Sequence, residues 1–247
     1  MNNIELLKDR IKNGSNDSLI NSNKIITFLN PFSYLFFRNE LKVFSDFDII
    51  LIDGISLVYL TRLINLNTKR YSFDMTSLAP LVFENCIKNN LSIYFVGSTE
   101  KSINIFIKKI KSKYLKLKIS GYRNGFFNNS EERHEEIQKI ILINPEVVVV
   151  GMGTPNQEEF LTSLRNYGWS GSGYTCGGFI HQTATNINYY PRLIKKYNFK
   201  WLYRMYDEPK LIKRYFIFYP TSIFLFIIDL MKYKYYKITN KNSHKKN

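Results

Sequence analysis

The segment spanning residues 147–160, which reads VVVVGMGTPNQEEF, constrains the fold more than any other part of the chain. Four consecutive valines predict a strand that is buried on both faces, as the strands of parallel sheets in α/β proteins are. A loop with two glycines and a proline follows, and then a polar segment that is expected to start a helix. In open α/β sheets, ligands bind at loops of this kind, where a strand ends and a helix begins.

The residues of this loop suit the close approach of a ligand. Gly151 and Gly153 allow tight turns and leave room beside the backbone, and Pro155 fixes one φ angle. We expect Asn156 to cap the helix, with two glutamates in its first turn. The amide of Gln157 is suited to reading a base or a sugar hydroxyl. The glycines alone are equally compatible with an ordinary strand-to-helix loop.

Short apolar runs alternate with helical patterns from residue 24 to residue 178. The predicted strands are residues 24–28, 47–52, 91–96, 117–120, 147–150 and 174–176. The predicted helices between them are residues 34–42, 55–64, 74–90, 98–114, 131–142 and 157–167. A short amphipathic helix and a flexible connector precede them, and residues 121–127 are predicted to form a turn. This alternation predicts an α/β fold with a doubly wound, mostly parallel, Rossmann-like sheet.

Several predicted strands end in residues that suit a ligand site. Asn30 follows the first strand, Asp53 and Gly54 follow the second, and Gly97 ends the third. Because the carboxyl ends of parallel strands meet at one edge, we expect these residues to lie together. Asp53 is a candidate base in such a crevice, or a cap for the helix that follows it. His181, just after a glycine pair, is either a functional residue or a polar residue of a structural turn.

The positive charge is concentrated in the last quarter of the chain. Residues 188–247 contain fourteen Lys or Arg and three acidic residues, so about +11 of the formal +15 lies there. Residues 215–231 are largely apolar but are interrupted by Pro220 and Asp229, and lysines flank them. Seventeen such residues are too few for a typical membrane-spanning helix, which needs about twenty. An interfacial anchor that meets anionic lipid fits better, and a buried helix in an oligomer is the alternative.

These features divide the chain into three parts. We expect an α/β catalytic core over residues 1–188, a basic and aromatic appendage over 189–237, and a disordered tail over 238–247. Trp201 and Arg204 lie one helical turn apart in the appendage, as a packed surface pair or as part of a site. The first residues lack the apolar region of a signal peptide, which predicts a location on the cytoplasmic side of the membrane.

Motifs of several other functional classes are missing from the sequence. Cys86 and Cys176 lie ninety residues apart without CxxC spacing, so neither a zinc site nor a disulfide framework is predicted. The chain has no HExxH metal-binding motif, no Walker loop for nucleotide phosphates and no DxD pair at a strand end. A nicotinamide-dependent oxidoreductase is disfavoured because the GxGxxG fingerprint is absent. A nucleic-acid-binding protein is disfavoured because the basic residues flank an apolar run rather than line a groove with spaced aromatics.

Five blocks of sequence, taken together, resemble the WecG/TagA/CpsF family, which is glycosyltransferase family 26. They are DGI at 53–55, FVG at 95–97, GMGTPNQE at 151–158, GG at 177–178, and WLYR at 201–204 with EP at 208–209 and RY at 214–215. The resemblance covers about residues 24–215. It implies a metal-independent, inverting transferase that moves a sugar from a UDP-sugar to a polyprenyl-diphosphate-linked acceptor in the synthesis of cell-surface polysaccharides. It also implies peripheral attachment to the inner face of the plasma membrane through an appendage that closes the active site.

The resemblance also implies roles for individual residues. Asp53 matches the catalytic base, which would deprotonate the acceptor hydroxyl, and Arg204 and Arg214 match arginines that would neutralise the leaving diphosphate. Asn30 and Gln157 match nucleotide-contacting positions. The expected catalytic residues are Asp53 and Arg204, and the expected substrate-binding residues are Thr27, Asn30, Gly54, Asp74, Gly97, Gly151, Gly153, Pro155, Gln157, Gly178, His181 and Arg214.

The chain departs from the family pattern at several places. The threonine that usually stands two residues before Asn30 is Phe28 here, with Thr27 one place away, and His181 replaces an aspartate. Tyr189 replaces the arginine of the usual RAP segment, and Lys200 replaces the usual glutamate before Trp201. The segment that leads to Asp74 also differs, although Asp74 itself is present. We interpret these differences as a change of donor or acceptor, and a catalytically degenerate scaffold is the alternative. The expected partners are a UDP-sugar, a polyprenyl-diphosphate-linked sugar, an anionic membrane surface and a second copy of the chain, with no nucleic acid and no cofactor.

Overall fold

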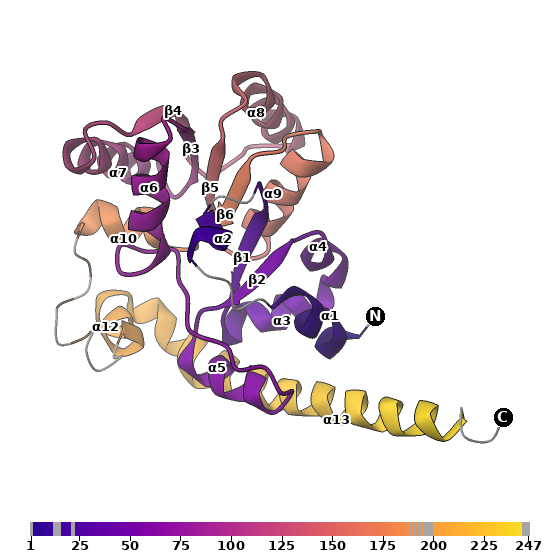
Figure 1. Ribbon diagram of the computed structural model, residues 1–247. Coiled ribbons are helices and arrows are strands. Elements are labelled where there is room, and N and C mark those ends of the chain that lie inside the picture. The colour runs from indigo at the N-terminus through magenta and orange to yellow at the C-terminus, as the bar shows by residue number, and fades with distance from the viewer. Residues whose placement is uncertain are drawn as a thin grey trace.

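The computed structural model describes residues 2–11, 16–20, 23–187, 189, 191, 194 and 200–243. Parts of the predicted connector and the predicted domain boundary at residue 188 lie outside these residues. One parallel sheet has six strands in the order β2-β1-β6-β5-β3-β4 (Figure 1). The strands are β1 (Ile25–Leu29), β2 (Ile49–Ile52), β3 (Ser92–Gly97), β4 (Lys118–Arg123), β5 (Val147–Gly151) and β6 (Ser172–Thr175). The predicted α/β fold is therefore confirmed.

Helices pack on both faces of this sheet, and others form the C-terminal part (Figure 1). Those of the α/β part are α1 (Asn3–Arg10), α2 (Asn16–Ile20), α3 (Pro31–Asn39), α4 (Leu41–Ser45), α5 (Ile55–Arg62), α6 (Leu78–Lys88), α7 (Glu100–Lys113), α8 (Ser130–Ile143), α9 (Asn156–Asn166) and α10 (Phe179–Thr185). The C-terminal elements are α12 (Lys200–Asp207), the 3-10 helix η1 (Pro209–Leu211), the π-helix η2 (Arg214–Phe218) and α13 (Tyr219–Ser243).

Two segments differ from the sequence prediction because of side-chain hydrogen bonds. The expected flexible connector contains α2, where the carbonyl of Ile20 accepts a hydrogen bond from Asn85 Nδ2 at 3.4 Å. The helix predicted to begin near Asp74 begins at Leu78 instead. Asp74 Oδ1 accepts a hydrogen bond from the backbone N–H of Thr76 at 2.7 Å, and this bond closes a turn before the helix.

Two boundaries were also predicted wrongly. β4 continues to Arg123, through three residues of the predicted turn. A Cβ on Gly121 would lie 2.1 Å from Cε2 of Tyr94, so the glycine is required by the packing of this ring. Asn156 is the first residue of α9 and does not cap it; the cap position is Pro155, which makes no side-chain hydrogen bond.

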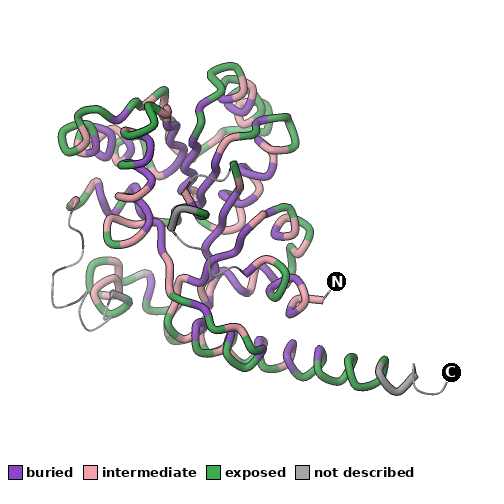
Figure 2. The backbone as a smooth tube through the Cα atoms, viewed as in Figure 1, coloured by how far each residue is buried: buried purple, intermediate pink, exposed green. Residues whose placement is uncertain are grey.

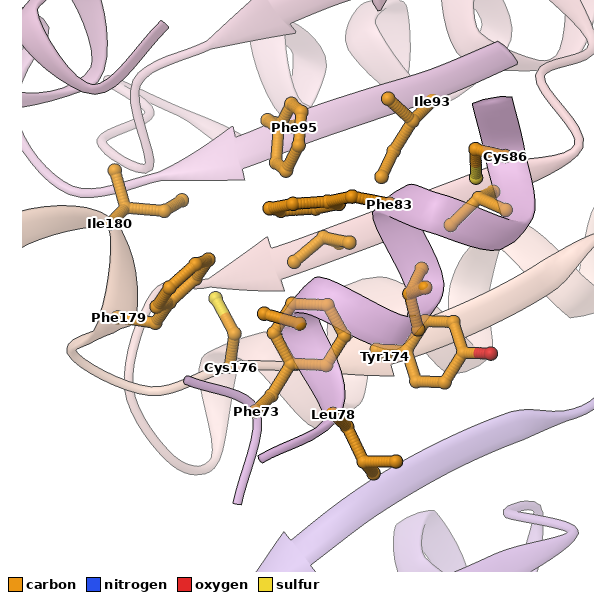
Figure 3. Packing of buried hydrophobic residues seen from close by; sticks show 14 of the residues in the cluster. Phe73, Leu78, Phe83, Cys86, Ile93, Phe95, Tyr174, Cys176, Phe179 and Ile180 are labelled. Carbon is orange, nitrogen blue, oxygen red and sulfur yellow. The ribbon is translucent and has the colours of Figure 1, made fainter. Parts of the chain in front are cut away.

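Among the described residues, the largest apolar core lies on one face of the sheet and combines aliphatic with aromatic side chains (Figure 3). Phe95 and Phe106 pack edge to face with ring centroids 5.0 Å apart, and Phe106 packs on Phe179 in the same way at 5.5 Å. Burying one such ring contributes about 1.5–3 kcal/mol. Because Phe179 is the first residue of α10, this core fixes the start of α10 next to the carboxyl end of β6.

The long helix α13 packs on α1, α3 and α5, and its C-terminal half extends past the rest of the fold (Figures 1 and 2). Phe226 and Leu230 are buried in a second apolar cluster with Tyr34 and Phe37 of α3. The helix ends at Ser243, so residues 238–243 are helical, although the sequence analysis assigns them to a disordered tail. Residues 244–247 lie outside the described part of the chain.

Asp229, which interrupts the apolar sequence of α13, is buried against α3 and α1. Its Oδ2 accepts hydrogen bonds from Arg38 Nε at 2.6 Å, Tyr34 OH at 2.8 Å and Asn3 Nδ2 at 2.9 Å. Arg38 Nη2 also donates to Oδ1 at 3.1 Å. Burial opposes ionisation of Asp229, but these hydrogen bonds outweigh it and hold its pKa below the ordinary value. α13 is thus fixed to the core by an ion pair as well as by apolar contacts.

Candidate active site

A cavity of about 740 Å³ lies at the carboxyl ends of the central strands. Its walls come from the loops after β1, β2, β3, β5 and β6, from residues 70–74, and from α12, η1, η2 and the start of α13 in the C-terminal part. The expected site residues that line it are Asn30, Asp53, Gly54, Asp74, Gly151, Gly153, Gln157, Gly178, His181, Arg204 and Arg214. Segments far apart in the sequence therefore meet in one place, at the sheet edge where the fold predicts a ligand.

Asp53 faces this cavity at the end of β2 and does not cap α5, whose cap position is Gly54. Its Oδ1 accepts hydrogen bonds from Nη2 of Arg70 at 3.1 Å and from Nε at 3.2 Å. Arg70 is placed there because it pairs with Ile52 through an isolated parallel bridge beside the end of β2. Oδ2 of Asp53 accepts no hydrogen bond from the described residues. The carboxylate is thus held by one oxygen, and the other remains open to a substrate.

Arg70 is a site residue that the sequence analysis missed. It belongs to no predicted strand or helix and to no motif, and a single bridge brings it to Asp53. Its nearest sequence signal is its place four residues before Asp74, which also lines the cavity.

Asn30 caps α3, as its place after β1 suggests. Its Oδ1 accepts hydrogen bonds from the backbone N–H groups of Phe32 at 3.0 Å and Ser33 at 3.1 Å, and from Arg214 Nη2 at 3.3 Å. The guanidinium of Arg214 stacks on the Phe32 ring, with Cζ 4.1 Å from the ring centroid. Burial lowers the pKa of Arg214, and its buried Nε has no hydrogen-bond partner among the described residues. An anionic ligand group would supply the missing acceptor.

A second arginine, Arg204, reaches the cavity from α12 together with Trp201. Its Nη2 lies 3.7 Å from Oε1 of Glu208. A Cβ on Gly178 would lie 3.5 Å from Nη2 of Arg204 and 2.9 Å from Nε2 of Gln182, so a glycine gives these side chains room. Among the described residues, three arginines therefore line the cavity, and two of them come from the C-terminal appendage.

Gln157 lines the cavity, but its amide is also bound within the protein. Its Nε2 donates to Oε1 of Glu158 at 2.9 Å and to Oγ1 of Thr154 at 3.3 Å, while its Oε1 accepts from the backbone N–H of Gly177 at 3.0 Å. The amide thus joins the loop after β5 to the loop after β6. One lone pair of Oε1 remains available for a ligand.

Glu158 lies in the first turn of α9, as predicted, but it is fully buried behind this loop, which the sequence analysis did not predict. Instead of simply facing the helix dipole, its Oε1 accepts hydrogen bonds from Gln157, from Thr154 at 3.2 Å and from Thr27 Oγ1 at 3.0 Å. Thr27 is itself buried in β1 and does not line the cavity; its hydroxyl also lies 2.9 Å from that of Thr175. Burial raises the pKa of Glu158 to about 7.

Of three further expected residues, His181, Gly97 and Pro155, only His181 lines the cavity. His181 is exposed on α10 at the cavity wall, with Nδ1 3.3 Å from Oγ of Ser102. Gly97 and Pro155 do not line the cavity. A Cβ on Gly97 would lie 2.3 Å from the carbonyl oxygen of Gly151, so this glycine allows close packing of neighbouring loops. In the part of the chain that is described, no group of three or more His, Cys, Asp or Glu residues is placed to hold a metal ion.

Comparison with known proteins gives matches over most of the chain. Residues 3–236 match the family described as the glycosyl transferase WecG/TagA/CpsF family. A UDP-Gal:alpha-D-GlcNAc-diphosphoundecaprenol beta-1,4-galactosyltransferase from Shigella boydii is 37% identical over 210 residues, covering 84% of this chain and 88% of the relative. An N-acetylglucosaminyldiphosphoundecaprenol N-acetyl-beta-D-mannosaminyltransferase from Bacillus subtilis is 28% identical over 199 residues, covering 77% and 74%.

Proposed function

Since the chain belongs to the WecG/TagA/CpsF family of glycosyltransferases, we propose that it transfers a sugar from a UDP-sugar to a polyprenyl-diphosphate-linked acceptor. The observation that carries this proposal is one cavity in which the carboxylate of Asp53 shares the walls with Arg204 and Arg214. A base and a cationic site for a diphosphate are the two parts that this chemistry needs.

The relatives support a choice of substrates for the first experiments. The Shigella boydii relative, which matches most of this chain, uses UDP-galactose as its donor. Both relatives act on an N-acetylglucosamine that is linked through diphosphate to undecaprenol, as their names state. We therefore propose UDP-galactose as the donor and N-acetylglucosaminyl-diphospho-polyprenol as the acceptor, with an N-acetylhexosamine donor as the alternative.

The contacts of Asp53 support its role as the base. In the proposed reaction, Oδ2 takes the proton of the acceptor hydroxyl while that oxygen bonds to the anomeric carbon of the donor. The bond from the anomeric carbon to the diphosphate oxygen breaks on the opposite face, so UDP leaves and the configuration inverts. Arg70 holds the carboxylate through Oδ1, which leaves Oδ2 to act as the base in the cavity that Asp53 lines.

The arginines of the appendage are proposed to bind the diphosphate. Arg214 is buried, stacked on Phe32, and has an Nε without a partner in the described structure, while Arg204 lines the same cavity. Two guanidinium groups can neutralise the charge that develops on the leaving UDP. On this basis we propose that transfer requires no divalent metal.

The C-terminal helix supports attachment to a membrane surface. Among the described residues, one segment, Arg214–Asn240, has the length and apolar composition of a membrane-crossing helix. Only 22% of its most apolar 18-residue stretch is buried inside the protein. However, the ion pair between Asp229 and Arg38 holds this helix along the core. We propose peripheral binding, in which exposed apolar side chains enter the lipid boundary while lysines meet anionic headgroups. These side chains are Phe216, Ile217, Phe224, Ile227 and Met231, with Lys213, Lys232, Lys234 and Lys237.

The function can be tested by following transfer from radiolabelled UDP-sugars to a synthetic N-acetylglucosaminyl-diphospho-lipid in detergent. We expect turnover with UDP-galactose that persists in EDTA, and loss of at least about a thousandfold in Asp53→Asn, with UDP affinity changed less than threefold. Absence of transfer with every UDP-sugar would contradict the proposal. Loss of UDP binding in Asp53→Asn would mean that Asp53 binds the donor rather than acting as the base.

A further inference from the structure

The cavity opens beside apolar side chains that the reaction centre does not use. Ile55, the first residue of α5, and Phe216 of η2 both line the cavity, yet 41% and 67% of their surfaces are exposed. They come from different elements and meet at the same cavity. An apolar rim therefore borders a cavity that is lined by Arg70, Arg204 and Arg214.

The apolar surface continues from this rim along α5. Tyr59 and Leu63 follow Ile55 at intervals of four residues, and Leu63, the C-cap residue of α5, keeps helical backbone angles, so the three side chains form one stripe. Tyr59 is 55% exposed and Leu63 is 51% exposed, while Leu57 and Val58 on the other side of α5 are buried in the core. At 1.5 Å per residue, the stripe runs about 12 Å away from the cavity. Figure 1 shows α5 lying along α13.

We propose that this stripe binds the first part of the hydrocarbon chain of the lipid acceptor, an inference that rests on the proposed function. A polyprenyl diphosphate carries its charge at one end and its apolar chain directly behind it. The site matches this order, because Asp53, the proposed base for the acceptor sugar, lies among charged side chains inside the cavity and the apolar stripe begins at its rim. Arg62, whose Cζ lies 4.8 Å from the Tyr59 ring centroid, adds a cation at the far end, where the chain would enter anionic lipid.

Leu63 gives the sharpest test, because it lies two helical turns from the cavity and does not line it. Transfer is measured in detergent with three acceptors that carry the same N-acetylglucosaminyl diphosphate on chains of one, three and eleven isoprene units. We expect the KM of the wild type to fall as the chain lengthens. Leu63→Ser should raise the KM for the longest acceptor about fivefold to tenfold and leave the KM for the shortest acceptor within twofold.

The matched control is Leu142→Ser, which removes a leucine that is 85% exposed at the end of α8. It should leave all three KM values unchanged. Equal increases for short and long acceptors in Leu63→Ser, or no increase at all, would overturn the proposal. A vesicle sedimentation assay without acceptor shows whether the stripe binds the bilayer itself rather than the hydrocarbon chain of the acceptor. If Leu63→Ser lost vesicle binding but kept its KM values in detergent, the stripe would bind the bilayer, and the proposal would be wrong.

These outcomes are distinct from failure of the proposed function. If the wild type transferred no sugar to any of the three acceptors, the assignment of the reaction would fail. If it transferred sugar to all of them with equal KM values, the reaction would stand and the site for the hydrocarbon chain would not.

Discussion

Replacing Glu158 with glutamine should change how the stability of the protein depends on pH. Glu158 has no exposed surface, its Oε2 has no partner among the described residues, and burial raises its pKa from the ordinary 4.5 to about 7. The difference corresponds to about 3 kcal/mol, at about 1.4 kcal/mol for each pH unit. Protonation of Glu158 stabilises the folded state, because the folded protein has the higher pKa and binds the proton more tightly than the unfolded chain does.

The stabilising contribution of the protonated Glu158 is complete below about pH 4.5, where both states carry the proton. It is lost as the pH rises through about 7, because the folded protein must then either keep the proton or bury a charge. Glutamine cannot ionise, and its carbonyl can accept the same hydrogen bonds from Thr27, Thr154 and Gln157. The free energy of unfolding of Glu158→Gln should therefore rise by about 3 kcal/mol relative to the wild type between pH 4.5 and pH 8.

Urea unfolding at half-unit steps of pH measures this difference directly. Other titrating groups are common to both proteins, so they cancel in the comparison. Glu159→Gln, on the same turn of α9 but with a side chain that is 40% exposed, controls for the removal of one carboxylate. A constant difference between Glu158→Gln and the wild type from pH 4.5 to 8 would refute the reasoning, whatever its size. It would mean that Glu158 does not gain or lose its proton differently in the folded protein.

Three further predictions concern the candidate site and α13. Asp229→Ala removes the acceptor of the hydrogen bonds from Arg38, Tyr34 and Asn3, so it should lower the free energy of unfolding by about 2 kcal/mol and expose α13 to protease. Adding Arg38→Ala to this variant should lower the free energy of unfolding little further, which a double-mutant cycle in urea would test. Arg70→Gln should lower kcat about tenfold or more while the Kd for UDP, measured by calorimetry, stays within twofold, because Arg70 orients Asp53; an equal loss in UDP affinity would point to a role in donor binding. His181→Asp should change the ratio of kcat/KM for UDP-galactose and a UDP-N-acetylhexosamine about tenfold, because an anion would replace an imidazole at the cavity wall; an unchanged ratio would remove His181 from donor selection.

The sheet could be predicted from the sequence because its strands are buried on both faces. All five residues of β1 and all five of β5 are buried, so β5 appears as an unbroken apolar run and β1 as a run interrupted only by Thr27, each with a polar or glycine-bearing end. Parallel pairing then brings those ends together, which is why Asn30, Asp53 and Gly151 were expected in one place and line one cavity. For these strands, the local sequence pattern therefore predicts the tertiary arrangement of their ends.

Contacts between distant segments could not be predicted in the same way. Glu158 has the sequence context of an exposed carboxylate in the first turn of a helix, and only the placement of Thr27 behind it shows that it is buried. Arg70 has no periodic pattern of its own, and its role depends on a bridge to Ile52. In both cases the deciding partner is more than fifteen residues away in the sequence, so local patterns carry no signal for it.

Asp229 shows how such a contact changes the interpretation of a whole segment. In the sequence it interrupts an apolar run and counts against a membrane-spanning helix, because an unpaired carboxylate within a bilayer is costly. In the structure it is paired with Arg38 of α3, and the same turn of α13 places Phe226 and Leu230 in the core. A helix held in this way keeps one side on the protein and presents the other side outward.

The outward side is apolar beside η2 and basic beyond Met231, an arrangement that suits the surface of a bilayer better than its interior. η2 also supplies Arg214 and Phe216 to the cavity. Binding of this face to a membrane would therefore bring the cavity rim close to the lipid headgroups, where the diphosphate of a lipid acceptor lies. In the proposed attachment, the ion pair of Asp229 and Arg38 holds the membrane-facing helix to the fold that carries the cavity, and we expect Asp229→Ala to weaken transfer to long-chain acceptors more than transfer to short-chain ones.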